Sequence, residues 1–129
     1  MNFFIKKDST FPILVYPITE KLMKQLNLTE SMFENVAVTF SMTNSTTNAY
    51  KIANSGGFLY INNVEENPDM EKFSIGFKFN LNQTHVSGNY FGEFVIDFLD
   101  NDNMGKLKLP LDDKINIVIN ETITKTTVV

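Results

Sequence analysis

His85 is the only histidine of the chain and the first residue to consider for catalysis. Ser87 follows it by two positions and Asp97 lies further on, so the residue types of a Ser/His/Asp triad are present. Triad residues can come from distant parts of a sequence, but no nucleophile elbow such as Gly-x-Ser-x-Gly accompanies these three. We therefore interpret His85 as a surface histidine in a turn.

Residues 100–105, Asp-Asn-Asp-Asn-Met-Gly, partly match the calcium-binding loop of an EF-hand. Aspartate and glycine stand at positions 1, 3 and 6, but Met104 and Leu111 occupy positions 5 and 12, where oxygen ligands are required. Asn, Asp and Gly also suit a hairpin loop, because they adopt positive φ. We prefer the hairpin and leave a weak ion site there open.

Four carboxylates, Glu65, Glu66, Asp69 and Glu71, cluster around Pro68. General acid–base catalysis needs one carboxyl of a pair to be desolvated so that its pKa rises. A charged, proline-containing loop is instead typical of a solvated surface, so we predict no catalytic pair here.

Gly56-Gly57 is not followed by Lys-Ser or Lys-Thr, so it does not match a phosphate-binding loop. The sequence therefore predicts no catalytic, cofactor-binding or metal-binding residues, no cofactor and no enzyme activity.

Apolar and polar residues alternate with a period of two over much of the chain, which is typical of strands with one buried face. The alternation covers residues 36–43, 73–81, 90–98, 106–109 and 115–119. Successive strands with no long helix between them predict an all-β fold, an antiparallel sandwich or barrel. In the second segment, the pattern places Leu81 on the buried face with Phe73.

The amino-terminal part predicts a strand at 3–7 or at 10–18. Pro12 and Pro17 cannot donate to a ladder, so this segment belongs at a sheet edge or crosses between sheets. Residues 19–26 predict a short helix with Thr19 as its N-cap, and residues 29–33 predict a second helical turn.

Turn residues separate the middle strands. We predict a turn at 44–48, its hairpin partner at 49–53, a tight turn at 54–57, a short strand at 58–62 and an acidic loop at 64–70.

The 129 residues fit one domain, 1–129, with 121–129 as an extended or disordered tail. The net charge of −4 and the dispersed lysines argue against a nucleic-acid partner. No apolar run approaches the roughly 18–20 residues needed to span a bilayer, so no membrane partner is expected.

Cysteine is absent, which excludes disulfides. Asn-x-Ser/Thr matches occur at Asn27, Asn44, Asn82 and Asn120, as chance produces in a chain rich in Asn and Thr.

Two stretches carry a family resemblance: 5–12 with 36–43, and 84–94 with 98–100 and 107–110. The second contains Gly88, Tyr90 and Phe94 in a Gly-x-Tyr-x-x-x-Phe pattern. It resembles the immunoglobulin-like domain of tailed-phage virion proteins, including the amino-terminal domain of baseplate upper proteins. The resemblance implies a single immunoglobulin-like antiparallel β-sandwich that assembles into a virus particle and carries no catalytic residues.

Physical arguments agree with this resemblance at two positions. A buried Tyr90 would bond its hydroxyl back to the backbone, as in a tyrosine corner, and Gly92 would leave room in the core for a bulky ring.

These observations predict a structural virion component, assembled in the host cytoplasm and bound to the capsid surface as an auxiliary protein. Its partner would be the major capsid protein or another virion protein, with self-association in the particle left open. A tail or baseplate adaptor is the alternative. From another class comes a carbohydrate-binding module that would use Tyr16, Tyr50, Tyr60 or Phe91, although each of these rings also has a place in a core.

The termini are the predicted docking elements. Lys6, Lys7 and Pro12 protect the first strand region, whereas Ile123 to Val129 is β-branched and carries only Lys125. Pairing of this tail with a partner strand would supply affinity.

Overall fold

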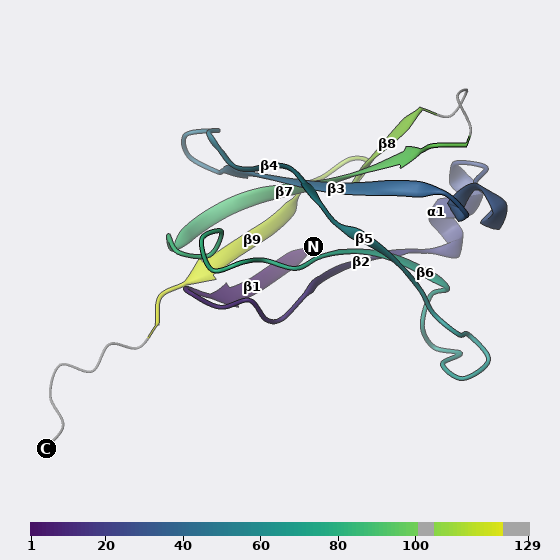
Figure 1. Ribbon diagram of the computed structural model, residues 1–129, viewed down its shortest axis with the longest axis horizontal. Coiled ribbons are helices and arrows are strands. Elements are labelled where there is room, and N and C mark those ends of the chain that lie inside the picture. Colours follow the sequence, from purple (N-terminus) through teal and green to yellow (C-terminus); the bar gives the residue numbers. More distant parts are fainter. Residues whose placement is uncertain (101–104, 123–129) are drawn as a thin grey trace, which may run out of the picture.

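The computed structural model describes residues 1–100 and 105–122, which form two β-sheets packed as a sandwich (Figure 1). With 47% strand and 8% helix the protein is mostly β, as predicted. The strands are β1 (Asn2–Lys6), β2 (Leu14–Ile18), β3 (Val36–Asn44), β4 (Tyr50–Gly56), β5 (Phe58–Ile61), β6 (Phe73–Phe77), β7 (Gly88–Phe98), β8 (Lys106–Leu109) and β9 (Ile115–Asn120). An α-helix, α1 (Glu20–Gln25), and a 3-10 helix, η1 (Glu30–Phe33), lie between β2 and β3.

The strand order follows that of an immunoglobulin-like sandwich. One sheet has the order β1-β9-β7-β3-β4 and the other β2-β6-β5. These correspond to strands G-F-C-C′ and B-E-D of the variable-type fold, with β1 added beside β9. The β1–β9 pair is parallel, whereas the other described pairs are antiparallel. Because β9 pairs with the first half of β7 and β8 with the second half, both together fill the place of strand G.

The two amino-terminal strands that the sequence offered as alternatives both form. β1 is an edge of the larger sheet and β2 an edge of the smaller one, so the chain crosses between sheets in the segment that contains Pro12. Pro17 lies within edge strand β2, where a missing N–H is tolerated.

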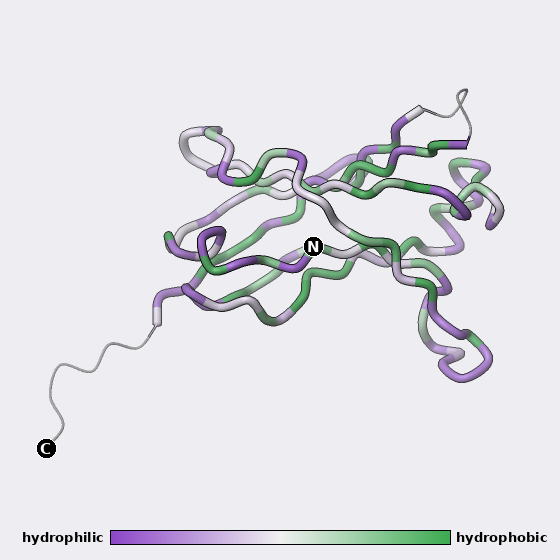
Figure 2. The backbone as a smooth tube through the Cα atoms, in the orientation of Figure 1, coloured by the Kyte–Doolittle hydropathy of each residue, from purple (hydrophilic) through white to green (hydrophobic). Residues whose placement is uncertain are grey.

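Phenylalanine rings fill the space between the sheets. Phe40 on β3 is fully buried, and its ring centroid lies 4.7 Å from that of Phe77 and 4.9 Å from that of Phe94. Phe79 closes the cluster, with its centroid 5.9 Å from that of Phe40. Figure 2 shows the predicted alternation of hydrophobic and hydrophilic residues along the strands.

The predicted strand at 73–81 is too long. β6 ends at Phe77, and Leu81 is 58% exposed although the pattern placed it in the core. All five residues of β6 are buried, including the outward Ser74 and Gly76, because Tyr60 and Phe58 of β5 stand opposite them. The period-two pattern continued past the end of β6 because Phe79, which lies in the following loop, is also buried in the core.

The predicted tight turn at 54–57 is also wrong. β4 continues to Gly56, and Gly57 joins it directly to β5 in the other sheet. The N–H of Gly57 donates to Val38 O at 2.8 Å, and a Cβ at Gly57 would lie 2.6 Å from Gly76 O. Glycine is therefore required here for close approach of two strands.

The turn at 44–48 and the helix at 19–26 are confirmed. Asn44 Oδ1 accepts hydrogen bonds from the N–H groups of Thr46 and Thr47 at 2.9 and 3.1 Å. Thr19 caps α1, because its Oγ1 accepts from the Leu22 N–H at 3.1 Å.

Tyr90 forms the predicted tyrosine corner. It is buried at the start of β7, and its hydroxyl donates to Val86 O at 2.8 Å. The bond ties the β6–β7 connection to the sheet, which is the role of this residue in immunoglobulin-like domains.

We expect Tyr90→Phe to lower the free energy of unfolding by about 0.5–1.5 kcal/mol, the usual net contribution of one hydrogen bond. Urea denaturation followed by circular dichroism measures the change. Tyr50→Phe on the exposed side of β4 is the control, and an equal loss in both variants would contradict the role of the corner.

Burial raises the pKa of the Tyr90 hydroxyl above its ordinary value of 10.0. The folded state then holds the proton more tightly than the unfolded state. The contribution of the Tyr90 hydroxyl to the free energy of unfolding is therefore fully present below pH 10 and is lost as the pH rises through the folded pKa. The stability difference between wild type and Tyr90→Phe should therefore be constant near neutral pH and shrink above about pH 10.

Candidate functional site

A hollow lies at one end of the sandwich, between the β2–β3 connection and the β5–β6 loop. Its volume is about 1000 Å³, and α1, η1 and residues 64–73 contribute its lining. The β7–β8 connection begins at the same end (Figure 1). There the side chain of Asn35 donates from Nδ2 to Asp100 Oδ1 at 2.9 Å. In immunoglobulin variable domains, loops at one end of the sandwich form the binding surface.

The end of α1 places two apolar residues at the hollow. Asn27 has a left-handed backbone with φ 54°, its N–H donates to Lys24 O, and the next N–H, of Leu28, donates to Met23 O at 2.8 Å. This is a Schellman motif, in which the residues at the two ends of the longer bond usually touch. Met23 and Leu28 both line the hollow.

We expect Asn27→Ala to lower the free energy of unfolding by about 1–2 kcal/mol, because alanine tolerates the left-handed region poorly. Asn27→Gly is the matched control and should be neutral or slightly stabilising, since glycine adopts positive φ without strain. Thermal denaturation of both variants measures the difference. Equal losses would mean that the asparagine side chain, and not its backbone, sets the stability.

Buried apolar side chains form the floor of the hollow. Ile18, Leu28 and Phe73 are all buried and line it. The Phe73 ring stacks on that of Phe33, with centroids 4.7 Å apart. The floor is thus continuous with the core.

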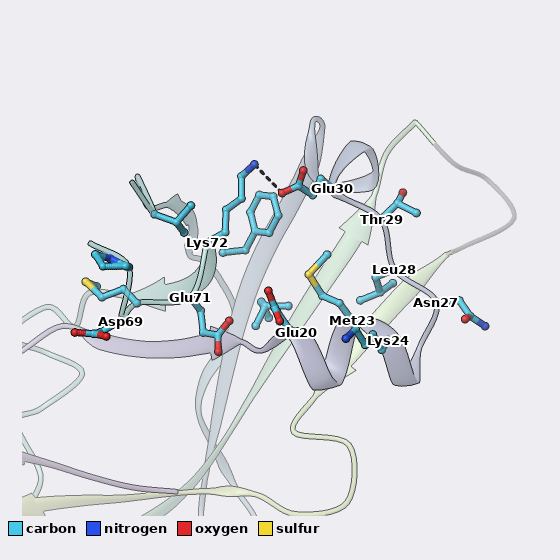
Figure 3. A pocket seen from close by; sticks show the side chains of 15 residues that line it. Glu20, Met23, Lys24, Asn27, Leu28, Thr29, Glu30, Asp69, Glu71 and Lys72 are labelled. Atoms are coloured by element: carbon cyan, nitrogen blue, oxygen red, sulfur yellow. Dashed lines mark ion pairs between the residues drawn. The ribbon is translucent and has the colours of Figure 1, made fainter. Parts of the chain in front are cut away.

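The rim is charged and bridged on one side by an ion pair. Lys72 Nζ lies 2.7 Å from Glu30 Oε1 and 5.6 Å from the Phe73 ring centroid. Figure 3 shows this pair, with Asp69 and Glu71 on one side of the hollow and Glu20 of α1 on the other. Both partners of the pair are exposed, so it contributes at most about 1 kcal/mol.

Asn62 holds the β5–β6 loop, which forms the wall of the hollow opposite α1 and η1. It is buried, its N–H donates to Lys72 O at 2.7 Å, and its side-chain amide donates to Asn67 O at 3.4 Å. Nothing in the sequence indicated this role, because an asparagine after a short strand is equally typical of an ordinary turn.

The structure does not assemble the triad considered for His85. His85 Nδ1 lies 2.8 Å from Asp8 Oδ1, and both side chains are exposed. Ser87 donates its hydroxyl to the Glu121 carboxylate. Asp97 lies near the other end of β7, about 30 Å from Gly88 by the rise of a strand.

The remaining candidate residues are dispersed. Asp69 and Glu71 line the hollow, whereas Glu65 and Glu66 do not. Of the calcium-like segment, residues 101–104 lie outside the described residues. In the described parts of the chain, no three His, Cys, Asp or Glu side chains gather so as to hold a metal ion.

The four aromatic candidates for glycan binding fall into two groups. Tyr16 and Phe91 are half-buried, and Lys114 Nζ covers the Phe91 ring at 4.4 Å from its centroid. Tyr50 and Tyr60 are exposed, 70% and 51%, so the expected core position is wrong for these two. They lie in different sheets, on β4 and β5.

Among the described residues, no helix has the length and apolar character to cross a membrane. Comparisons with protein-family models, curated proteins and solved structures found no match for the chain.

Proposed function

We propose that the protein is a structural, non-catalytic component of a tailed-bacteriophage particle, bound to the capsid surface as an auxiliary protein. The observation that carries this proposal is the corner built by Tyr90. The segment that resembles the phage virion domains forms a buried tyrosine corner at the start of β7, in a sheet with the immunoglobulin-like strand order. Its partner would be the major capsid protein or another virion protein.

The sheet edges favour docking through loops over docking through strand addition. An edge is protected by charge, proline, a bulge or short length. β1 carries the exposed Lys6, β2 contains Pro17, β4 is bulged near Asn54, and β5 is four residues long. The hollow at the loop end is therefore the surface that we favour for the partner.

The predicted role of the carboxyl-terminal tail is a separate matter, since residues 123–129 lie outside the described part. Deletion of 121–129 tests it. Unchanged occupancy of the truncated protein on particles would make the tail dispensable and leave the interface on a loop or a sheet face.

The function itself is tested by counting copies in purified particles. A copy number that matches the capsid subunits supports the auxiliary capsid role, whereas about six or twelve copies would favour the tail or baseplate adaptor. Absence of the protein from intact particles would exclude both.

A carbohydrate-binding module remains the candidate of a different class, because Phe58 and Tyr60 share the outer face of β5. Built at Gly76, a Cβ would lie 2.4 Å from Phe58 Cζ, so this ring lies across the glycine on the neighbouring strand. A glycan array compared between wild type and Tyr60→Ala tests the idea, and no binding by the wild type would remove it.

A further inference from the structure

The hollow between α1–η1 and the β5–β6 loop combines an apolar interior with an acidic rim. Ile18, Leu28 and Phe73 supply a buried floor, and the wall includes the exposed side chains of Val64 and Met70. Exposed apolar residues beside a recess are a usual feature of protein-binding surfaces. Methionine suits such a wall, because its unbranched chain adapts to an incoming group.

The charges on the rim are unbalanced. Four carboxylates and two lysines line the hollow, namely Glu20, Glu30, Asp69, Glu71, Lys24 and Lys72. The ion pair of Lys72 with Glu30 neutralises one of each sign. Three carboxylates and Lys24 then remain, so an occupant with positive charge beside its apolar part is complementary to the rim.

We propose that this hollow receives an apolar side chain flanked by lysine or arginine, presented by a segment of a partner protein. The inference rests on the proposed function only in taking the protein to be an interaction module. Beyond that function, the inference names the chemistry of the partner segment and the surface that binds it. The apolar side chain would lie against Leu28 and Phe73, and the flanking cations would lie near Glu20, Asp69 and Glu71.

The test uses three capped pentapeptides and isotopically labelled full-length protein, observed by NMR. The probe is Gly-Lys-Leu-Lys-Gly, and the controls are Gly-Glu-Leu-Glu-Gly and Gly-Lys-Gly-Lys-Gly. We expect the probe to shift amide signals of α1, η1 and residues 64–73, and both controls to bind at least about fivefold more weakly. Equal binding of all three, or no binding of the probe, would overturn the proposal.

A matched pair of charge reversals on one loop locates the interaction. The first double variant, Asp69→Lys with Glu71→Lys, reverses two charges on the rim. The second, Glu65→Lys with Glu66→Lys, makes the same change of net charge at residues that do not line the hollow. We expect the first variant to weaken probe binding at least about tenfold and the second to change it less than about threefold. Binding should also weaken at about 1 M salt, where the Debye length is about 3 Å. Equal effects of the two variants would mean attraction to overall charge and would overturn the proposal.

Occupancy on particles separates this inference from the proposed function. If the protein is present in particles but the rim variant joins them with normal occupancy and the probe does not bind, the hollow is not the interface and the virion role stands. If the probe binds as expected but the protein is absent from particles, the virion role falls and the recognition chemistry stands.

Discussion

Replacing Phe40 with alanine is expected to lower the free energy of unfolding by about 3–5 kcal/mol, the usual cost of removing a buried phenylalanine ring. Phe40 is fully buried, and its ring contacts those of Phe77 and Phe94 from the facing and neighbouring strands at centroid distances of 4.7 and 4.9 Å. The loss comprises burial of the ring, the cavity left behind and the aromatic contacts. A domain of ordinary stability has about 5–15 kcal/mol in total, so the variant would lie close to unfolding.

Urea denaturation followed by circular dichroism measures this effect, which suits a chain without tryptophan. Phe11→Ala is the control, because Phe11 is 76% exposed and should change the free energy of unfolding by less than about 0.5 kcal/mol. Similar losses in both variants would contradict the assignment of Phe40 to the centre of the core.

The sequence predicted the strands whose one face is buried and whose other face meets solvent. β3, β7 and β9 follow their alternation because the pleat puts every second side chain between the sheets. The pattern failed for β6, whose residues are buried on both faces, and beyond it, where Phe79 reaches the core from a loop. Alternation reports one buried face and carries no information on where a ladder ends.

The hollow was beyond prediction for a different reason. Its lining comes from residues 18–30 and 64–73, two segments that are far apart in the sequence. None of these residues is of an unusual type for a strand, a helix or a loop. Glu30 and Lys72 meet only because η1 and β6 lie at the same end of the sandwich. The acidic loop was recognised and read as a solvated surface, but nothing in it showed that Asp69 and Glu71 face a recess while Glu65 and Glu66 do not.

At Gly92 the prediction from the sequence, a glycine that leaves room for a ring in the core, agrees with the packing in the structure. Gly92 follows Tyr90 by two positions, which is the place of the second cysteine of antibody domains. The ring of Phe40 on β3 packs against Gly92, whereas in those domains a tryptophan on strand C packs against the disulfide. The chain has neither cysteine nor tryptophan. In this chain a phenylalanine ring packs on a glycine between β3 and β7 instead.

Gly92→Ala is accordingly expected to cost about 1–3 kcal/mol through overpacking, and larger side chains should cost more. A Cβ at Gly92 would lie 2.7 Å from both Phe40 Cζ and Ile117 Cδ1, closer than carbon atoms approach without displacement. Gly56→Ala is the matched control, because a Cβ there meets nothing within 4 Å. That change should be neutral or stabilise the protein by about 0.4–1 kcal/mol, since it restricts the unfolded chain.

The cause of the stability loss in Gly92→Ala can be tested with Phe40→Leu. This change replaces the ring that the new Cβ would meet with a smaller side chain. If the two side chains compete for one space, the double variant should be more stable than the sum of the single losses predicts, by about 0.5–3 kcal/mol. Urea denaturation of the four proteins gives this coupling energy. A sum without coupling would mean that the contact with Ile117, and not the contact with the Phe40 ring, sets the loss, and the ring-on-glycine packing between β3 and β7 would not be the reason for glycine at this position.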